Sequence, residues 1–212
     1  MFIKLWDLQI FVEYFGYFRE KHVSSEYQEI KVEICAVVLS IKVIRPTSLM
    51  TEQKQYYYFF KDQDEFSNFY ACQFTDPKDN FVYSSSEKYF MMAKAVFFKD
   101  FKTLEHMKLE DTPKKVKALG RKVQNFNEEE WKKVSKMYMT EGLMLKFGQN
   151  EDLKKVLLDT GDKIIAEASP FDKLWGIGID ETTAIKNKNQ WKGLNWLGEC
   201  LMNVRAQLKS QQ

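Results

Sequence analysis

The segment from Glu87 to about Phe98 constrains the fold more than any other part of the chain. It is apolar nearly all round, and the serine run at 84–86 before it supplies a helix N-cap. At about 100° per residue, Lys94 returns to within about 20° of Glu87, so one face of a buried helix carries an acid and an amine. Burying an unpaired charge is costly. The two groups must therefore form a structural pair in the core, find other partners or line a wet cavity.

The rest of the chain after residue 50 predicts short strands and several helices. Hydrophobic periodicity, caps and turn residues define them. We expect a helix-dominated α+β domain with a small, short-stranded sheet that contains both Tyr56–Phe60 and Phe81–Tyr83. The turn between the early strands is expected at Thr75–Asn80. The other expected elements are a strand at Ile164–Ile165 and helices at about 113–120, 128–147, 152–159 and 194–208.

Residues 1–49 differ from the remainder and are interpreted as an appendage of unknown role, followed by a domain at 50–212. Val32, Ile34 and their neighbours allow a strand or hairpin between 30 and 44. The aromatic start is a poor match to a secretory signal, because acidic residues interrupt it. Met50 precedes the part that carries motifs, so a start of translation there is a hypothesis.

Composition excludes several classes of protein. The 32 Lys and Arg nearly balance the 30 Asp and Glu, so the chain is not coated in basic charge for nucleic acid. No apolar run reaches the roughly 18 residues of a membrane span, and no membrane association is expected. Three widely spaced cysteines favour a reducing compartment, so we expect a cytoplasmic protein. Two isolated histidines give no metal cluster, and no metal or cofactor is expected.

The second informative stretch runs from Thr160 to Ile179. Glu167 and Asp172 flank a Ser-Pro turn, and Trp175 precedes two closely spaced glycines. This Gly-x-Gly is too weak for a dinucleotide fingerprint, because the third glycine and the strand–helix context are missing. The stretch is either a tight loop whose tryptophan caps the core or part of a ligand site.

These pieces, in this order, resemble the NADAR (YbiA-like) family of N-glycosidases over about residues 58–208. Each matching motif is weak alone, but their joint order and spacing make chance agreement improbable. The matching motifs are Phe66–Tyr70, Ser86-Glu87 with Tyr89-Phe90 and Ala93–Ala95, Leu119–Arg121 with Val123, Trp131, Lys146-Phe147, Leu157-Leu158 with Thr160-Gly161, Glu167–Ser169 with Asp172 and Trp175–Gly178, and Trp191, Gly193, Asn195, Leu197 and Gly198 followed by Leu201-Met202 and Val204-Arg205.

The resemblance implies cleavage of the bond between a ribose anomeric carbon and nitrogen. The substrates that the resemblance implies are phosphorylated ribosylamino-pyrimidine intermediates of riboflavin synthesis, or ADP-ribosylated guanine, including guanine within a nucleic acid. Glu87, Lys94 and Asp172 are then the expected catalytic residues, with the amine acting as an acid or as a Schiff-base nucleophile. The expected substrate-binding residues are Ser67, Asn68, Arg121, Trp131, Trp175 and Asn195. The sequence does not define an oligomeric state.

Two positions depart from the family pattern, and two other functions remain open. Lys88 and Met91 stand where family members often have His and Gln. These two departures affect the expected contacts to the base more than the expected chemistry. One alternative is a non-catalytic module that binds ADP-ribose or another nucleotide. The other is a helical interaction protein in which every match is core packing. Basic clusters at 114–122 and 186–192 are either solvated surface or a docking strip for nucleic acid.

Overall fold

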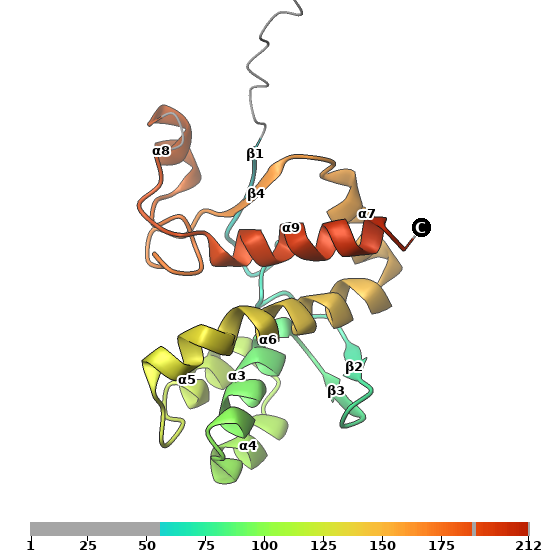
Figure 1. The fold of residues 1–212 in the computed structure, drawn as a ribbon, viewed down its shortest axis with the longest axis vertical. Coiled ribbons are helices and arrows are strands. Elements are labelled where there is room, and N and C mark those ends of the chain that lie inside the picture. Colours follow the sequence, from blue (N-terminus) through green and yellow to red (C-terminus); the bar gives the residue numbers. More distant parts are fainter. Residues whose placement is uncertain (1–55, 188–189, 212) are drawn as a thin grey trace, which may run out of the picture. The chain divides into compact units, whose positions relative to one another are not determined.

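The computed structural model describes residues 56–187 and 190–211, so the appendage predicted at 1–49 lies outside the described residues. Helices dominate the described part, and the predicted helix-rich α+β class is confirmed (Figure 1). The helices are α3 (Ser86–Phe97), α4 (Phe101–Lys108), α5 (Pro113–Gly120), α6 (Glu128–Gln149), α7 (Glu151–Asp159), α8 (Glu181–Lys186) and α9 (Trp196–Lys209).

The strands form two separate pairs. β1 (Tyr56–Phe59) runs parallel to β4 (Ile164–Glu167), with Phe59 opposite Glu167, whereas β2 (Phe74–Asp76) and β3 (Phe81–Tyr83) form an antiparallel hairpin. The prediction that β1 and β3 share one sheet is therefore wrong. β2 occupies part of the segment that was expected to be turn, and it pairs locally with β3, whereas β1 pairs with a strand more than 100 residues later. Strands of three or four residues are too short for alternation to reveal their partners.

Local capping explains where several helices begin. The Ser85 hydroxyl accepts the Lys88 N–H at 3.2 Å at the start of α3. At the start of α6, Asn127 Oδ1 accepts the Glu130 N–H at 3.0 Å, and α5 begins at Pro113 as predicted. Because these signals lie within four residues of each helix, the sequence alone predicts these starts.

Two short helices were not predicted, and one predicted helix begins later than expected. The missed helices α4 and α8 are capped by Asp100 and Asp180, whose side chains accept N–H groups of Thr103 and Thr183. α9 begins at 196 instead of 194 because Asn195 adopts a left-handed conformation with φ 56°.

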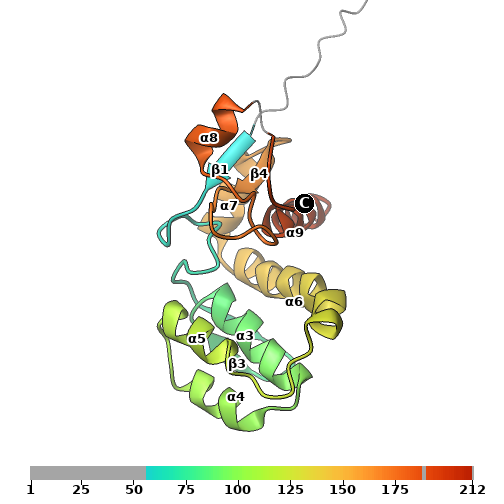
Figure 2. The ribbon, with the colours of Figure 1, turned by 90° about the vertical axis from the view of Figure 1, so that its left-hand side faces the viewer.

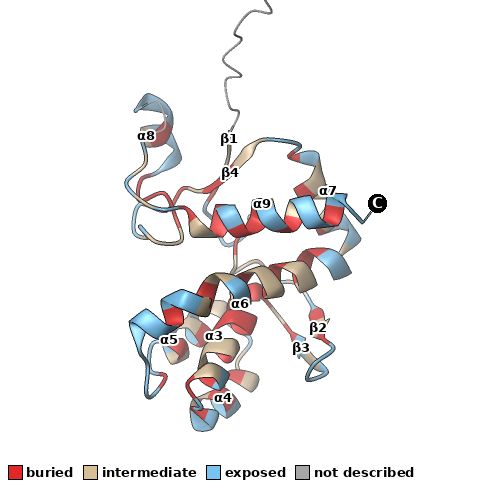
Figure 3. Ribbon diagram, viewed as in Figure 1, coloured by how far each residue is buried: buried red, intermediate tan, exposed pale blue. Residues whose placement is uncertain are grey.

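α6 is the central helix of the described part. Figures 1 and 2 both show α3, α4 and α5 on one side of α6, and α9 with the β1–β4 pair on the other. Many of the buried residues lie where these helices meet (Figure 3). Gly142 lets α3 approach α6 closely, since a Cβ there would lie 2.6 Å from the Tyr89 ring. This close packing fixes the first turn of α3 in the interior.

The ends of β1 and β4 open into the loops that matter for function. Phe60 to Phe69 follows β1, and Ala168 to Ile179 follows β4. Both loops face α3 and α5, with which they enclose one cavity. None of the described helices is long and apolar enough to cross a membrane.

Candidate active site

A cavity of about 650 Å³ brings together residues from distant parts of the chain. Its wall combines three buried or half-buried acids with basic and aromatic side chains, and Met139 of α6 closes one part of it. The acids are Glu87, Glu167 and Asp172. The other lining residues used below are Phe60, Lys61, Asp62, Ser67, Asn68, Phe69, Phe90, Met91, Lys114, Lys117, Arg121, Ser169, Phe171 and Trp175.

Glu87 lies in the first turn of α3 and is only 3% exposed. Its N–H donates to the Asn68 carbonyl at 2.9 Å, which ties α3 to the loop after β1. Its Oε1 finds no hydrogen-bond donor among the residues that the structure describes, and the nearest cation, Lys117 Nζ, is 4.0 Å away. Burial raises the pKa of Glu87, while Lys117 and Arg121 lower it and Asp172 raises it further. A buried acid with an unpaired oxygen is ready to bind a polar ligand.

Asp172 is held in place by the backbone that follows it. Its Oδ1 accepts the N–H groups of Leu174 at 2.9 Å and Trp175 at 2.8 Å. These bonds orient both the carboxyl group and the Trp175 ring, which meets Phe90 edge to face at 5.1 Å. The second oxygen, Oδ2, remains available to a ligand or a water molecule.

Glu167 is a third acid of the cavity that the sequence interpretation did not single out as catalytic. It is the last residue of β4, and its N–H donates to Asn195 Oδ1 at 3.1 Å. Burial raises the pKa of Glu167 to about 7, and Asp172 raises it in the same direction against the opposing effect of Lys117. Its only sequence signal is a glutamate at the end of a short strand, five residues before Asp172.

The loop at Ser67-Asn68 forms another part of the wall. The Ser67 carbonyl accepts a hydrogen bond from the fully buried Lys146 Nζ at 2.8 Å. Asn68 Oδ1 accepts the Ser86 hydroxyl at 3.0 Å. Both bonds hold the loop against helices α6 and α3, so the loop is positioned by residues outside the cavity.

Cations surround the acids at the cavity wall. Lys117 Nζ lies 5.1 Å from the centroid of the Phe69 ring as well as near Glu87. Lys114 pairs with Asp62 at 3.0 Å, and Arg121 is exposed. Cations beside a small cavity favour a ligand that carries negative charge.

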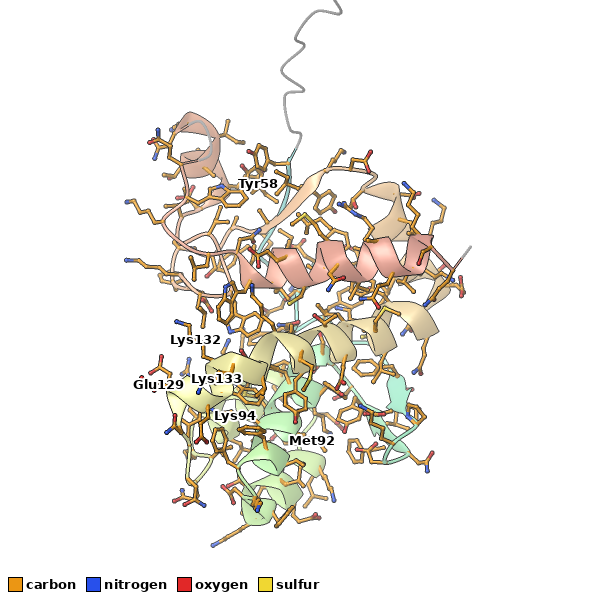
Figure 4. The ribbon with its side chains drawn as sticks, viewed as in Figure 1. Tyr58, Met92, Lys94, Glu129, Lys132 and Lys133 are labelled. Carbon is orange, nitrogen blue, oxygen red and sulfur yellow. The ribbon has the colours of Figure 1, made fainter. Side chains whose placement is uncertain are left out.

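Lys94 does not line this cavity, which corrects the expectation that it shares a site with Glu87. Lys94 is labelled in Figure 4. Its Nζ donates to the Gly120 carbonyl at 2.9 Å and lies 3.8 Å from the centroid of the Phe126 ring. Lys94 does lie on the same helix face as Glu87, but seven residues advance the helix by roughly 10 Å. The amine therefore caps the end of α5, and the amine nearest to Glu87 is that of Lys117.

Trp131 and Asn195 also lie outside the cavity wall. Trp131 packs behind Phe90 at 5.1 Å and stacks on Tyr138, so it supports the wall from the core. Asn195 holds the end of β4, because its Nδ2 donates to the Ile165 carbonyl at 2.9 Å. Six expected site residues do share the cavity: Glu87, Asp172, Ser67, Asn68, Arg121 and Trp175.

The two departures from the family pattern lie in different places. The Lys88 amine is buried and pairs with Asp111 at 2.8 Å, away from the cavity. Met91 does line the cavity, and it packs against Gly120. Of these two positions, only 91 can therefore contact a ligand in this cavity. Across residues 56–187 and 190–211, no group of three or more His, Cys, Asp or Glu residues is placed to hold a metal ion.

Comparisons with known proteins bear on the fold and on the family. A family model described as the NADAR domain matches residues 56–209. N-glycosidase R617 of Acanthamoeba polyphaga mimivirus is 46% identical over 128 residues, which is 59% of this chain and 74% of that protein. Protein irg-1 of Caenorhabditis elegans is 37% identical over 174 residues, 75% of this chain and 82% of that protein.

A bacterial relative links the sequence match to a solved fold. N-glycosidase YbiA of Escherichia coli is 31% identical over 147 residues, 69% of this chain and 82% of that protein. The NMR structure of E. coli YbiA matches with a TM-score of 0.62 and 29% identity, covering 75% of this chain and 88% of that one. The sequence match and the structural match both span most of the described residues.

Proposed function

The chain belongs to the NADAR domain family and is an N-glycosidase, and from that premise we propose that it cleaves the C1–N bond of a phosphorylated ribosyl substrate. The substrates we propose are a phosphorylated ribosylamino-pyrimidine of riboflavin synthesis or an ADP-ribosylated guanine. The observation that carries the proposal is the meeting of Glu87 and Asp172, 85 positions apart in the sequence, in one cavity with cations around it.

The two acids suit the charge that develops during this reaction. Breaking a glycosidic bond builds positive charge on the ribose ring, as in other glycoside hydrolyses. The Glu87 carboxylate, held near Lys117 and buried, stabilises that charge when the sugar lies beside its unpaired Oε1. Asp172, oriented by two backbone N–H groups, takes a proton from the attacking water. The cavity supplies a fixed electrostatic environment, so little reorganisation is needed during the reaction.

The cations and rings support a substrate with phosphate and base. Lys61, Lys114, Lys117 and Arg121 line the cavity and offer donors for phosphate oxygens. Phe171 is 88% exposed although it lines the cavity, and Trp175 is half-buried in the wall. Aromatic rings in such places stack on a base and keep water from the bond that breaks.

A product assay on a small panel tests the proposal. The panel contains the ribosylamino-pyrimidine phosphate, ADP-ribose and ADP-ribosylated guanine, and the readout is free base or amine and free sugar phosphate. Glu87→Gln and Asp172→Asn should each lower kcat by about 100-fold or more. Glu129→Gln is the matched control, because Glu129 is an exposed glutamate of α6 (Figure 4).

Two results would overturn the proposal. One is parental activity in both folded acid variants. The other is tight calorimetric binding of ADP-ribose by a wild-type protein that releases no product from any panel member. That second result would favour a nucleotide-binding module.

A further inference from the structure

We propose that Glu167 is a catalytic residue of the same reaction and delivers the proton that the departing nitrogen needs. This inference rests on the proposed N-glycosidase function and assigns the step that Glu87 and Asp172 leave open. An amine or a base nitrogen departs poorly as an anion, so the reaction requires an acid beside it. With Lys94 turned toward Gly120, that acid must come from another element of the cavity.

The backbone around Glu167 is fixed on three sides. Its N–H donates to Asn195 Oδ1 at 3.1 Å, and its carbonyl accepts N–H groups of Ser169 and Ile177, each at 2.9 Å. β4 is paired in parallel with β1, with Phe59 opposite Glu167 in the register. A side chain on such a fixed strand end keeps its place in the cavity wall, as proton transfer requires.

The charged groups around the cavity differ between Glu87 and Glu167. Glu87 is affected by two cations, Lys117 and Arg121, and by one acid, Asp172. Glu167 is affected by two acids, Asp172 and Glu87, and by one cation, Lys117. These neighbouring charges therefore favour the anionic form more at Glu87 than at Glu167, while burial raises the pKa of both carboxyl groups. The remaining charged lining groups, Lys61, Asp62 and Lys114, include the Lys114–Asp62 ion pair, which is internally neutral.

Burial acts on Glu167 in the same direction. It raises the pKa of this carboxyl group to about 7, and the neighbouring Asp172 adds to the effect. A carboxyl group with that pKa is about half protonated at neutral pH and can still release its proton. When the surroundings of two acids move their pKa values apart, one site can contain both a proton donor and an anion.

The atoms of the step balance with water as the only co-reactant. The C1–N bond breaks, its electron pair stays on nitrogen, and nitrogen takes the proton from Glu167. Water then bonds to C1 and loses a proton to Asp172. That proton returns to Glu167 through solvent, so both carboxyl groups regain their starting states. The products are a free amine or base and a ribose with a hydroxyl group at C1.

The test compares two leaving groups in wild type and in Glu167→Gln. The first is the panel N-glycoside that the wild type hydrolyses, and the second is 4-nitrophenyl riboside 5-phosphate, whose nitrophenolate departs without a proton. We expect Glu167→Gln to lower kcat on the N-glycoside by about 100-fold or more and to change the nitrophenyl rate less than about 5-fold. Glu129→Gln is the control and should change neither rate.

A pH profile of the wild type tests the same step without any variant. The N-glycoside kcat/KM should fall above about pH 7 as Glu167 loses its proton, whereas the nitrophenyl kcat/KM should not. Equal losses on both substrates in Glu167→Gln, or identical alkaline limbs in the wild type, would overturn the proposal for Glu167. An inactive Glu87→Gln beside an active Glu167→Gln overturns this proposal alone. A wild type inactive on every panel member overturns the proposed function as well.

Discussion

Asn195 offers the sharpest test of how the fold positions the candidate site. Its buried amide bridges the end of β4, donating to the Ile165 carbonyl at 2.9 Å and accepting the Glu167 N–H at 3.1 Å. Asn195→Ala leaves these two backbone groups without their partner, at about 1–3 kcal/mol each. It also places alanine at φ 56°, a left-handed conformation that costs a residue other than Gly or Asn roughly 1 kcal/mol.

The expected loss is therefore about 3–7 kcal/mol in the free energy of unfolding, a large share of the roughly 5–15 kcal/mol of a typical domain. Urea unfolding followed by circular dichroism measures it. Asn195→Gly keeps the backbone relaxed and should be about 1 kcal/mol more stable than Asn195→Ala. Asn203→Ala is the matched control, an exposed asparagine within α9, and should stay within about 0.5 kcal/mol of the wild type.

Asn195 is also expected to affect catalysis. Losing the bridge frees the end of β4, so Asn195→Gly should lower kcat on the N-glycoside even at temperatures where it is fully folded. A loss below about 1 kcal/mol in Asn195→Ala would refute the hydrogen-bond account of this residue. A direct role in substrate binding would instead raise KM with little change in stability.

Three further outcomes follow from the same contacts. Glu167 binds its proton more tightly in the folded state, so its contribution to the free energy of unfolding should fall by up to about 3 kcal/mol as pH rises from about 4.5 to about 7; in Glu167→Gln the fall seen in urea midpoints across pH should shrink to the part that comes from other groups such as Glu87. Lys146→Met removes the bond that holds the Ser67 loop while preserving volume, and should raise KM several-fold with a stability change under about 1.5 kcal/mol; an unchanged KM contradicts the positioning role. Lys94→Met should keep kcat within about 3-fold, because the amine binds Gly120 outside the cavity; a loss near 100-fold would return Lys94 to the chemistry.

Local features of the fold could be predicted because their causes lie close together in the sequence. Ser85 and Asn127 cap the helices that follow them, and Gly161, with φ 56°, follows the end of α7. Apolar spacing likewise identifies the buried face of α9. The short helices α4 and α8 escaped prediction because six to eight residues give too little periodicity to recognise.

The site itself was only partly accessible from the sequence. Glu87 could be singled out because burying an unpaired acid costs free energy, whichever part of the protein the apolar helix packs against. The helical wheel placed Lys94 on the same face, but an angle around the axis does not record the distance along it. Glu167 had only a weak local signal, since its surroundings come from Asp172, Asn195 and Lys117, which lie outside β4.

By itself, the sequence determined the helix-rich class, the caps, the burial of the first turn around Glu87 and the likeness to the NADAR family. Only the tertiary structure decided that β1 pairs with β4, that Lys94 turns to α5 and that Glu167 joins the two expected acids. Helix formation depends on neighbours three and four residues apart, whose effects can be read along the chain. Strand partners and shared cavities depend on contacts between distant segments, whose energies are set only when the whole core packs.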